Sequence, residues 1–203
     1  MGIYAKYILP RLMHLACGMR STMRQRKQVV PLASGHVLEI GAGSGLNLPF
    51  YDSRRVDRLW ALDPSLELWA MAADRVRKAA FPVEFLAAPA EAIPLDDQSV
   101  DTILITYSLC TIPDVSAALA EMRRVLRREG ELLFCEHGKA PDATVRRWQK
   151  LLDPRWTRLG GGCHLGRDIP SILHSGGFQV QKLSTMYVSG WRPASFNYWG
   201  VAK

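Results

Sequence analysis

The sequence predicts an α/β fold in which a mostly parallel β-sheet is covered by helices on both faces. Two observations support this fold class. Short apolar segments of strand length alternate with longer amphipathic segments from residue 37 to residue 136, and a glycine-rich loop follows the first apolar segment. Because parallel strands need crossover connections, this alternation favours helices on both faces of one sheet. We expect strands at residues 37–40, 58–62, 83–87, 101–106 and 131–136.

Helical patterns lie between these strands and after the last of them, near residues 46–52, 66–79, 114–128, 142–152 and 168–175. The end of the chain changes character, because residues 178–186 and 195–202 both read as strands. The sequence has no internal repeat and no linker that would divide it. We therefore expect a single domain over residues 1–203, made of an N-terminal leader (1–36), a core (37–136) and a tail (137–203).

The composition is that of an ordinary globular protein, with 48% hydrophobic and 22% charged residues. No apolar run reaches the ~18 residues that a bilayer span needs. The four cysteines, Cys17, Cys110, Cys135 and Cys163, show no Cys-x-x-Cys spacing, and no secretory segment precedes them. We therefore expect reduced thiols, a cytoplasmic protein and no bound metal.

The leader is basic. It has no Asp or Glu before Glu39, and six cations there account for most of the net charge of +7: Lys6, Arg11, Arg20, Arg24, Arg26 and Lys27. Apolar residues at helical spacing predict one amphipathic helix with Pro10 in its first turn: Ile8, Leu12, Leu15, Met19 and Met23. A solvated helix face explains such charge, but nucleic acid, anionic lipid or an acidic partner also attract it. We expect a solvated helix face here and no nucleic-acid partner; a lid over the site is our hypothesis, and a peripheral membrane contact is the alternative.

The segment from Glu39 to Gly45 (EIGAGSG) closes the first predicted strand. Its glycines permit a tight turn and let the backbone approach a ligand closely. The helix expected at 46–52 would aim free amides at that ligand. A dinucleotide fingerprint would place its third glycine at Leu46, so the spacing disfavours a nicotinamide cofactor. Asp63, at the end of the second strand, is positioned to accept hydrogen bonds from ribose hydroxyls. The alternative role for Asp63 is the N-cap of the helix that follows it.

These segments are followed in order by Ala90-Glu91, by the strand ending near Tyr107, and by the strand ending at Glu136. Together they resemble the successive motifs of class I S-adenosylmethionine-dependent methyltransferases, over about residues 37–136. The resemblance implies a Rossmann-like fold, a seven-stranded sheet with strand order 3-2-1-4-5-7-6, and S-adenosyl-L-methionine as the cofactor. A Rossmann-like fold without a cofactor is the alternative.

The resemblance also implies which residues hold the cofactor. Gly41, Ala42, Gly43 and Gly45 would pass beside its methionine moiety, Glu39 would support the loop, and Asn47 would meet the carboxylate. Asp63 would bind the ribose, with Pro64 shaping the turn after it. Ala90 and Glu91 would lie at the adenine edge, although Pro89 replaces the usual Asp before them. A carbonyl in the segment from Thr106 through Tyr107 to Ser108 would face the amino group.

A narrower resemblance comes from later motifs: Leu-Cys-Thr-Ile at 109–112, Glu-His at 136–137, Trp-Gln at 148–149, Asp-Pro-Arg-Trp at 153–156 and Gly-Cys-His-Leu at 162–165. They look like the methyltransferase-like group whose animal members S-methylate alkyl thiols. Those animal members carry an N-terminal membrane anchor, which we do not carry over to this chain. The resemblance implies a small, largely apolar acceptor, with a thiol sulfur as the leading candidate.

A thiol acceptor suits a site that lacks an obvious strong base, because a thiol is already partly ionised near neutral pH. His137 or His164 would complete the deprotonation, and Cys163 lies beside them in the motif. The alternatives are structural: His137 orders a strand end, and Cys163 and His164 form a turn after three glycines. We expect Cys110 and Cys135 to be small buried packing residues. We also expect Trp148 and Trp156 to pack in the core, and the alternative for either is to wall an apolar pocket.

Other acceptors remain open from the sequence. The rivals are an O-, N- or C-methyltransferase acting on a quinone, a lipid or a secondary metabolite, and a silent cofactor-binding protein. A nucleic-acid methyltransferase is disfavoured, because Tyr107-Ser108-Leu109-Cys110 stands where base N-methyltransferases have Asp/Asn-Pro-Pro-Tyr/Phe.

Overall fold

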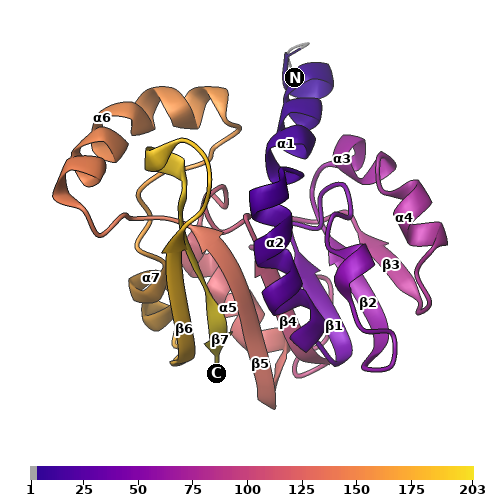
Figure 1. Cartoon of the computed structure of the whole chain (residues 1–203). Coiled ribbons are helices and arrows are strands. Elements are labelled where there is room, and N and C mark those ends of the chain that lie inside the picture. The colour runs from indigo at the N-terminus through magenta and orange to yellow at the C-terminus, as the bar shows by residue number, and fades with distance from the viewer. Residues whose placement is uncertain (1–3) are drawn as a thin grey trace.

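The computed structural model describes residues 4–203, and for Ala5 and Lys6 it describes the backbone alone. The start of the predicted leader, residues 1–3, and the charge of Lys6 therefore lie outside the described part. Seven strands form one sheet in the order β3-β2-β1-β4-β5-β7-β6, which confirms the predicted order (Figure 1). The strands are β1 Gly35–Ile40, β2 Val56–Leu62, β3 Val83–Leu86, β4 Val100–Thr106, β5 Leu126–His137, β6 Val180–Tyr187 and β7 Phe196–Ala202.

Strands β1 to β5 run parallel, and β7 is antiparallel to both β5 and β6. The helices are α1 Leu9–Cys17, α2 Arg20–Val29, α3 Leu66–Ala70, α4 Ala73–Arg77, α5 Val115–Val125, α6 Ala143–Leu159 and α7 Ile169–Ser175. Single turns complete the chain: a π-helical turn η1 Tyr4–Ile8 and 3-10 turns η2 Val30–Leu32, η3 Leu48–Phe50 and η4 Arg192–Ala194.

Two of the helices predicted after the leader differ from those observed. The prediction of a helix at 46–52 is wrong, because that segment holds only the 3-10 turn η3. Pro49 lacks an amide donor, and Tyr51 is already extended (φ −64°, ψ 138°), so the turn does not continue as a helix. The amides of the glycine loop are therefore not backed by an α-helix dipole. The helix expected at 66–79 is divided into α3 and α4.

The leader is two helices with different surroundings, so the prediction of a single amphipathic helix is wrong. Helix α1 ends at Cys17, and Met19 is extended (φ −59°, ψ 148°) before α2 begins. Leu12 and Leu15 of α1 remain exposed, whereas α2 buries Arg26 and Val29 against the sheet. Helix α2 thus belongs to the folded core, and only α1 projects beyond it (Figure 1).

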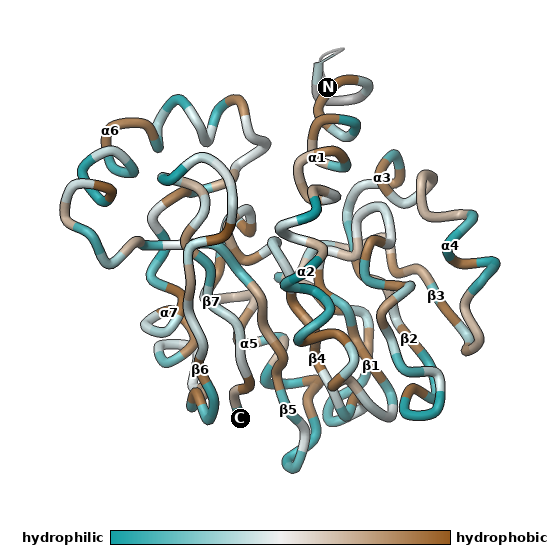
Figure 2. Tube along the Cα trace, viewed as in Figure 1, coloured by the Kyte–Doolittle hydropathy of each residue, from teal (hydrophilic) through white to brown (hydrophobic). Residues whose placement is uncertain are grey.

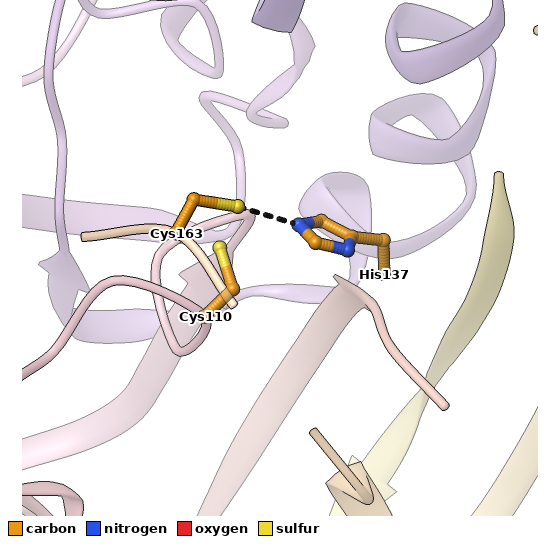
Figure 3. Close-up of side chains that lie close together, drawn as sticks. All are labelled: Cys110, His137 and Cys163. Atoms are coloured by element: carbon orange, nitrogen blue, oxygen red, sulfur yellow. Dashed lines mark hydrogen bonds between the residues drawn. The ribbon is translucent and has the colours of Figure 1, made fainter. Parts of the chain in front are cut away.

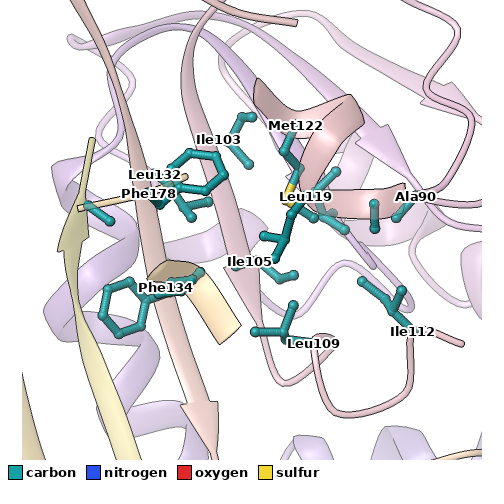
Figure 4. Close-up of a cluster of buried hydrophobic side chains, with 14 of the residues drawn as sticks. Ala90, Ile103, Ile105, Leu109, Ile112, Leu119, Met122, Leu132, Phe134 and Phe178 are labelled. Atoms are coloured by element: carbon teal, nitrogen blue, oxygen red, sulfur yellow. The ribbon is translucent and has the colours of Figure 1, made fainter. Parts of the chain in front are cut away.

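The core has one hydrophobic cluster on each face of the sheet. One cluster joins β1, β4 and β5 to α5 and α7 through residues such as Ile105, Met122 and Phe178 (Figure 4). The other joins the opposite face to α2 and η2 through Val29, Val30 and Leu133. Figure 2 shows the hydrophobic character of the central strands. In residues 4–203 no helix is long and apolar enough to cross a membrane.

Candidate functional site

The glycine loop turns sharply at the carboxyl end of β1. Gly41, Gly43 and Gly45 all have positive φ values, of +68°, +53° and +71°. A Cβ added to Gly41 would lie 2.1 Å from Ser108 Oγ, so the loop can approach the end of β4 only with glycine at this position. A Cβ at Gly43 would have no other atom nearer than 3.9 Å, so the space beside this residue is open to a ligand.

Asp63 faces this loop from the end of β2. Its Oδ2 accepts a hydrogen bond from the Gly43 amide at 2.8 Å, and its Oδ1 accepts one from the Ser65 amide at 2.8 Å. The cap of α3 is Ser65, whose Oγ accepts from the Leu68 amide at 3.2 Å. The N-cap role considered for Asp63 therefore belongs to Ser65, which leaves the Asp63 carboxylate beside the loop. Asp63 is 7% exposed, and burial raises its pKa.

Glu39 supports the loop from inside the protein. It accepts hydrogen bonds from Asn47 Nδ2 at 2.9 Å and from the Tyr51 hydroxyl at 2.7 Å. Burial raises the pKa of Glu39 to about 7, against the opposing effect of these bonds and of the nearby Arg26. Both carboxylate oxygens are engaged within the core, so Glu39 holds the loop in place.

Arg26 is a buried site residue that the sequence analysis missed. Its Nη1 donates to Asn47 Oδ1 at 2.7 Å and to Thr106 Oγ1 at 2.6 Å, and the residue is only 5% exposed. We counted Arg26 among the solvated charges of the leader. Its helical spacing from the apolar pair Val29 and Val30 was the signal that it shares their buried face.

The role predicted for Asn47 needs correction. Its side chain is fully buried, and its Nδ2 donates to Glu39 and to Thr106 Oγ1 at 2.9 Å, while its Oδ1 accepts from Arg26. With both amide atoms engaged in this network, Asn47 does not face the open side of the loop. It braces the loop against α2 and β4 and is not placed to meet a cofactor carboxylate.

The end of β4 is tied to β1 and β5. Tyr107 has φ +54°, an uncommon conformation for a bulky residue, and its buried hydroxyl donates to Asn197 Oδ1 at 2.7 Å. Only the backbone of Tyr107 therefore reaches this edge of the sheet. The Ser108 and Leu109 amides both donate to Glu136 Oε1, at 2.8 and 3.1 Å. Burial raises the pKa of Glu136 to about 7.

The residues predicted at the adenine edge have other contacts in this structure. Ala90 is buried in the α5-side cluster, and Glu91 Oε1 accepts from the amide of Asp114, the N-cap of α5, at 3.1 Å. Pro64 is exposed in the turn after β2. These residues border the same edge of the sheet as Asp63, and their contacts with a cofactor remain predictions.

Cys110, His137 and Cys163 come together from three separate segments: the loop after β4, the end of β5 and the turn after α6 (Figure 3). His137 Nε2 lies 3.2 Å from Cys163 Sγ. Hydrogen bonding to Cys110, followed by the interaction with His137, lowers the pKa of the Cys163 thiol despite its burial. Burial opposes a charge on His137, but the hydrogen bond and the charge of Cys163 outweigh it and raise the pKa of His137. Cys110 is therefore more than the packing residue that we expected.

His164 belongs to a different place. Its Nδ1 lies 2.9 Å from Asp153 Oδ2, and it lines a cleft of about 720 Å³ together with Lys139, Arg146, Gln149, Lys150, Asp153, Pro154, Gly166 and Arg167. We expected His137 or His164 to act as the base of one site. The structure separates them, because only His137 meets Cys163, whereas the His164 ring pairs with Asp153.

The tail motifs form a hydrogen-bonded framework around this cluster. The buried Gln149 amide donates to the carbonyls of Gly138, Leu165 and Pro193, at 2.9, 3.0 and 2.9 Å. Arg167 donates to the carbonyls of Leu109 and Ile112 in the loop after β4. These bonds fasten the tail to the ends of β4 and β5.

The two tryptophans of α6 behave differently. Trp156 packs against Trp191, with 5.2 Å between ring centroids, whereas Trp148 is 53% exposed, so the packing role expected for Trp148 is wrong. That exposure leaves Trp148 available at the surface of α6.

Helix α1 bridges the glycine loop and the tail. His14 Nδ1 lies 2.7 Å from Ser44 Oγ in the loop, and the Tyr4 hydroxyl, in η1 just before α1, donates to the Leu159 carbonyl at the end of α6 at 2.7 Å. Leu9 packs closely on Gly161: a Cβ added to Gly161 would lie 3.0 Å from Leu9 Cδ2. Helix α1 therefore lies across the edge of the sheet between the glycine loop and the turn that carries Cys163.

Comparison with known proteins supports a relationship to methyltransferases. The family described as "Methyltransferase domain" matches residues 38–134. Thiol S-methyltransferase TMT1B is 34% identical in Homo sapiens, covering 72% of this chain and 62% of that protein, and 30% identical in Mus musculus, covering 81% and 67%. A phosphatidylethanolamine N-methyltransferase of Cereibacter sphaeroides is 31% identical, covering 63% and 64%. The chain spans less than two thirds of the human protein's length.

Among solved structures, a putative methyltransferase from Bacillus halodurans superimposes with a TM-score of 0.68 at 18% identity, covering 82% of this chain and 73% of that one. At this identity the likeness concerns the fold alone, and it agrees with the strand order described above.

Proposed function

The chain belongs to the class I S-adenosylmethionine-dependent methyltransferases, close to the animal thiol methyltransferases, and we propose that it methylates the sulfur of a small, largely apolar thiol. The cofactor is S-adenosyl-L-methionine, which supplies an electrophilic methyl group on a sulfonium. Two features of the chain fit this cofactor: the open space beside Gly43 and the Asp63 carboxylate next to it. We infer that Asp63 binds the ribose hydroxyls, because a buried carboxylate beside backbone amides suits that role.

The observation that carries the thiol proposal is the His137–Cys163 pair. It lies where β5 ends, and the carboxyl ends of parallel strands lie at one edge of the sheet. There the Cys163–His137 pair would take the acceptor's proton, with Cys163 Sγ receiving it when the imidazole is already protonated, while the acceptor sulfur forms its bond to the methyl carbon and the sulfonium leaves as a thioether. The chain itself would bind and orient the thiol and remove this proton.

The reacting atom matters because acceptors differ in acidity. An imidazole can deprotonate a thiol whose pKa is about 8.5, but an aliphatic alcohol is far less acidic. An amine acceptor is the second candidate, favoured by the similarity to the lipid N-methyltransferase of Cereibacter sphaeroides. Leu12 and Leu15 of α1 are exposed apolar side chains, and they would suit either type of apolar molecule.

The experiment is the release of S-adenosylhomocysteine with an alkyl thiol, its alcohol isostere, the matching amine, or no acceptor. We expect turnover with the thiol alone, and we expect His137→Ala to reduce kcat at least about 100-fold, since general base catalysis contributes 10²–10⁴-fold. The matched control is His174→Ala, which changes an exposed histidine of α7. Turnover with the amine or the alcohol and none with the thiol, in protein that binds the cofactor, would overturn the proposal.

A further inference from the structure

We propose that Cys110, Cys163 and His137 together form a zinc-binding site with three protein ligands. The two sulfur atoms and an imidazole nitrogen lie within 4.8 Å of one another, and Figure 3 shows the two thiols and the imidazole ring facing one another. Within residues 4–203 no other group of three such side chains reaches this proximity. No motif spacing predicts this group, because the three ligands lie in three distant segments.

The donor set favours zinc. Zn²⁺ is borderline-soft and is bound by thiolate and imidazole, whereas Mg²⁺ and Ca²⁺ prefer oxygen ligands. No carboxylate belongs to the cluster as described. With Zn–S near 2.3 Å and Zn–N near 2.0–2.1 Å, tetrahedral ligands lie roughly 3.6–3.8 Å apart. The Cys163 Sγ to His137 Nε2 distance is 3.2 Å, so shifts of well under about 1 Å would admit the ion at this pair.

The backbone holds the ligands in place before any metal binds. The carbonyl of Cys110 accepts from the His164 amide at 2.9 Å. The carbonyl of Cys163 accepts a hydrogen bond from Thr157 Oγ1 at 3.2 Å. The amide of Cys163 donates to the carbonyl of Gly160, also at 3.2 Å. Both cysteines are buried. A site whose ligands are fixed by their surroundings loses little conformational entropy when it binds an ion.

Three protein ligands leave a fourth tetrahedral position open, which is typical of catalytic zinc and not of structural zinc. A thiol bound at that position would lose its proton to solvent and be held as a zinc thiolate. This last step rests on the proposed function, whereas the binding of zinc does not. The metal would then replace His137 as the group that generates the nucleophile.

The test begins with wild-type protein reduced with a phosphine, stripped with a chelator and titrated with Co²⁺. We expect one equivalent to bind, with sulfur-to-cobalt charge-transfer absorption and the intense visible bands of tetrahedral cobalt, and Zn²⁺ to displace it. Cys110→Ser, Cys163→Ser and His137→Ala should each weaken binding more than about 100-fold, beyond the 10–100-fold typical of a lost outer-shell partner. The matched control is Cys135→Ala, which removes a buried thiol that contacts the Tyr107 hydroxyl.

A second readout does not depend on variants that fold. Stoichiometric Zn²⁺ should slow alkylation of Cys110 and Cys163 in the wild-type protein, followed by peptide mass spectrometry, and leave Cys135 unaffected. Binding of cobalt without the tetrahedral spectrum, or a Cys110–Cys163 disulfide that forms equally fast with and without Zn²⁺, would overturn the proposal. Thiol methylation that persists in chelator, together with no zinc binding, would refute the zinc site alone. Zinc binding without thiol methylation would refute only the proposed acceptor.

Discussion

Asp63 Oδ2 accepts a hydrogen bond from the Gly43 amide at 2.8 Å, which ties the end of β2 to the glycine loop that follows β1. The contact joins the two features on which the proposed cofactor site rests. It also explains why the carboxylate does not cap α3, a task that Ser65 performs. The first two predictions follow from this arrangement.

Asp63→Asn should weaken S-adenosyl-L-methionine binding by about 10- to 100-fold, the cost of losing hydrogen bonds to a charged group. Isothermal titration calorimetry measures the Kd. The control is Asp52→Asn, which changes a carboxylate paired with the exposed Arg54. An unchanged Kd for Asp63→Asn would remove this residue from the cofactor site.

Gly41→Ala should destabilise the protein by clearly more than ~1 kcal/mol, because its Cβ would meet both strain at φ +68° and the Ser108 side chain. Gly177→Ala separates the two effects, since Gly177 has φ +81° but nothing within 4 Å of an added Cβ. Urea unfolding of both variants compares them. Equal losses of unfolding free energy would show that contact with Ser108 does not constrain the loop.

Glu39 should make the stability fall as pH rises from about 4.5 to 7. The pKa of Glu39 in the folded protein, about 7, exceeds the ordinary 4.5, so the folded state holds the proton more tightly than the unfolded state. The resulting contribution to the free energy of unfolding is fully present below pH 4.5 and is lost as the pH rises to about 7. The contribution is at most about 3 kcal/mol. Glu39→Gln should reduce the difference in unfolding free energy between pH 5 and pH 8. Part of that difference should remain in the variant, because the pKa of Glu136 is also raised to about 7. An unchanged difference would contradict the assigned pKa.

Removal of residues 1–17, which include α1, should raise KM for an apolar acceptor several-fold and leave the fold intact. We expect the effect on KM because α1 contacts Ser44 of the glycine loop and the turn at Gly161. We expect the fold to survive because the buried Arg26 belongs to α2, which the truncation keeps. Arg24→Ala, which alters an exposed side chain of α2 and leaves α1 in place, is the control. Unchanged kcat and KM after truncation would end the lid hypothesis, which we now restrict to α1.

Much of the fold could be predicted because local patterns determine it. The strands ending at Ile40, Leu62 and Thr106 are short apolar segments, and the crossover rule then requires parallel pairing. The helix at 46–52 was mispredicted because a glycine loop usually leads into a helix, whereas here Pro49 and the extended Tyr51 limit the segment to one turn.

The site was less predictable because its contacts join distant parts of the chain. Sequence order indicated the glycine loop and Asp63, but it could not show that Arg26 of α2 reaches Thr106 at the end of β4. It also assigned Cys110 to packing, since no local spacing connects it with Cys163 or His137. Such contacts depend on strand order and on the path of the tail, which a single sequence does not specify.

The most direct measurement of the central claim uses one acceptor that carries both nucleophiles. A mercaptoalcohol is incubated with the protein and with cofactor bearing a CD₃ group, and the position of the label is determined by mass spectrometry. We expect label on sulfur alone, with release of one S-adenosylhomocysteine for each label. Label on oxygen, or no label in protein that binds the cofactor, would contradict it.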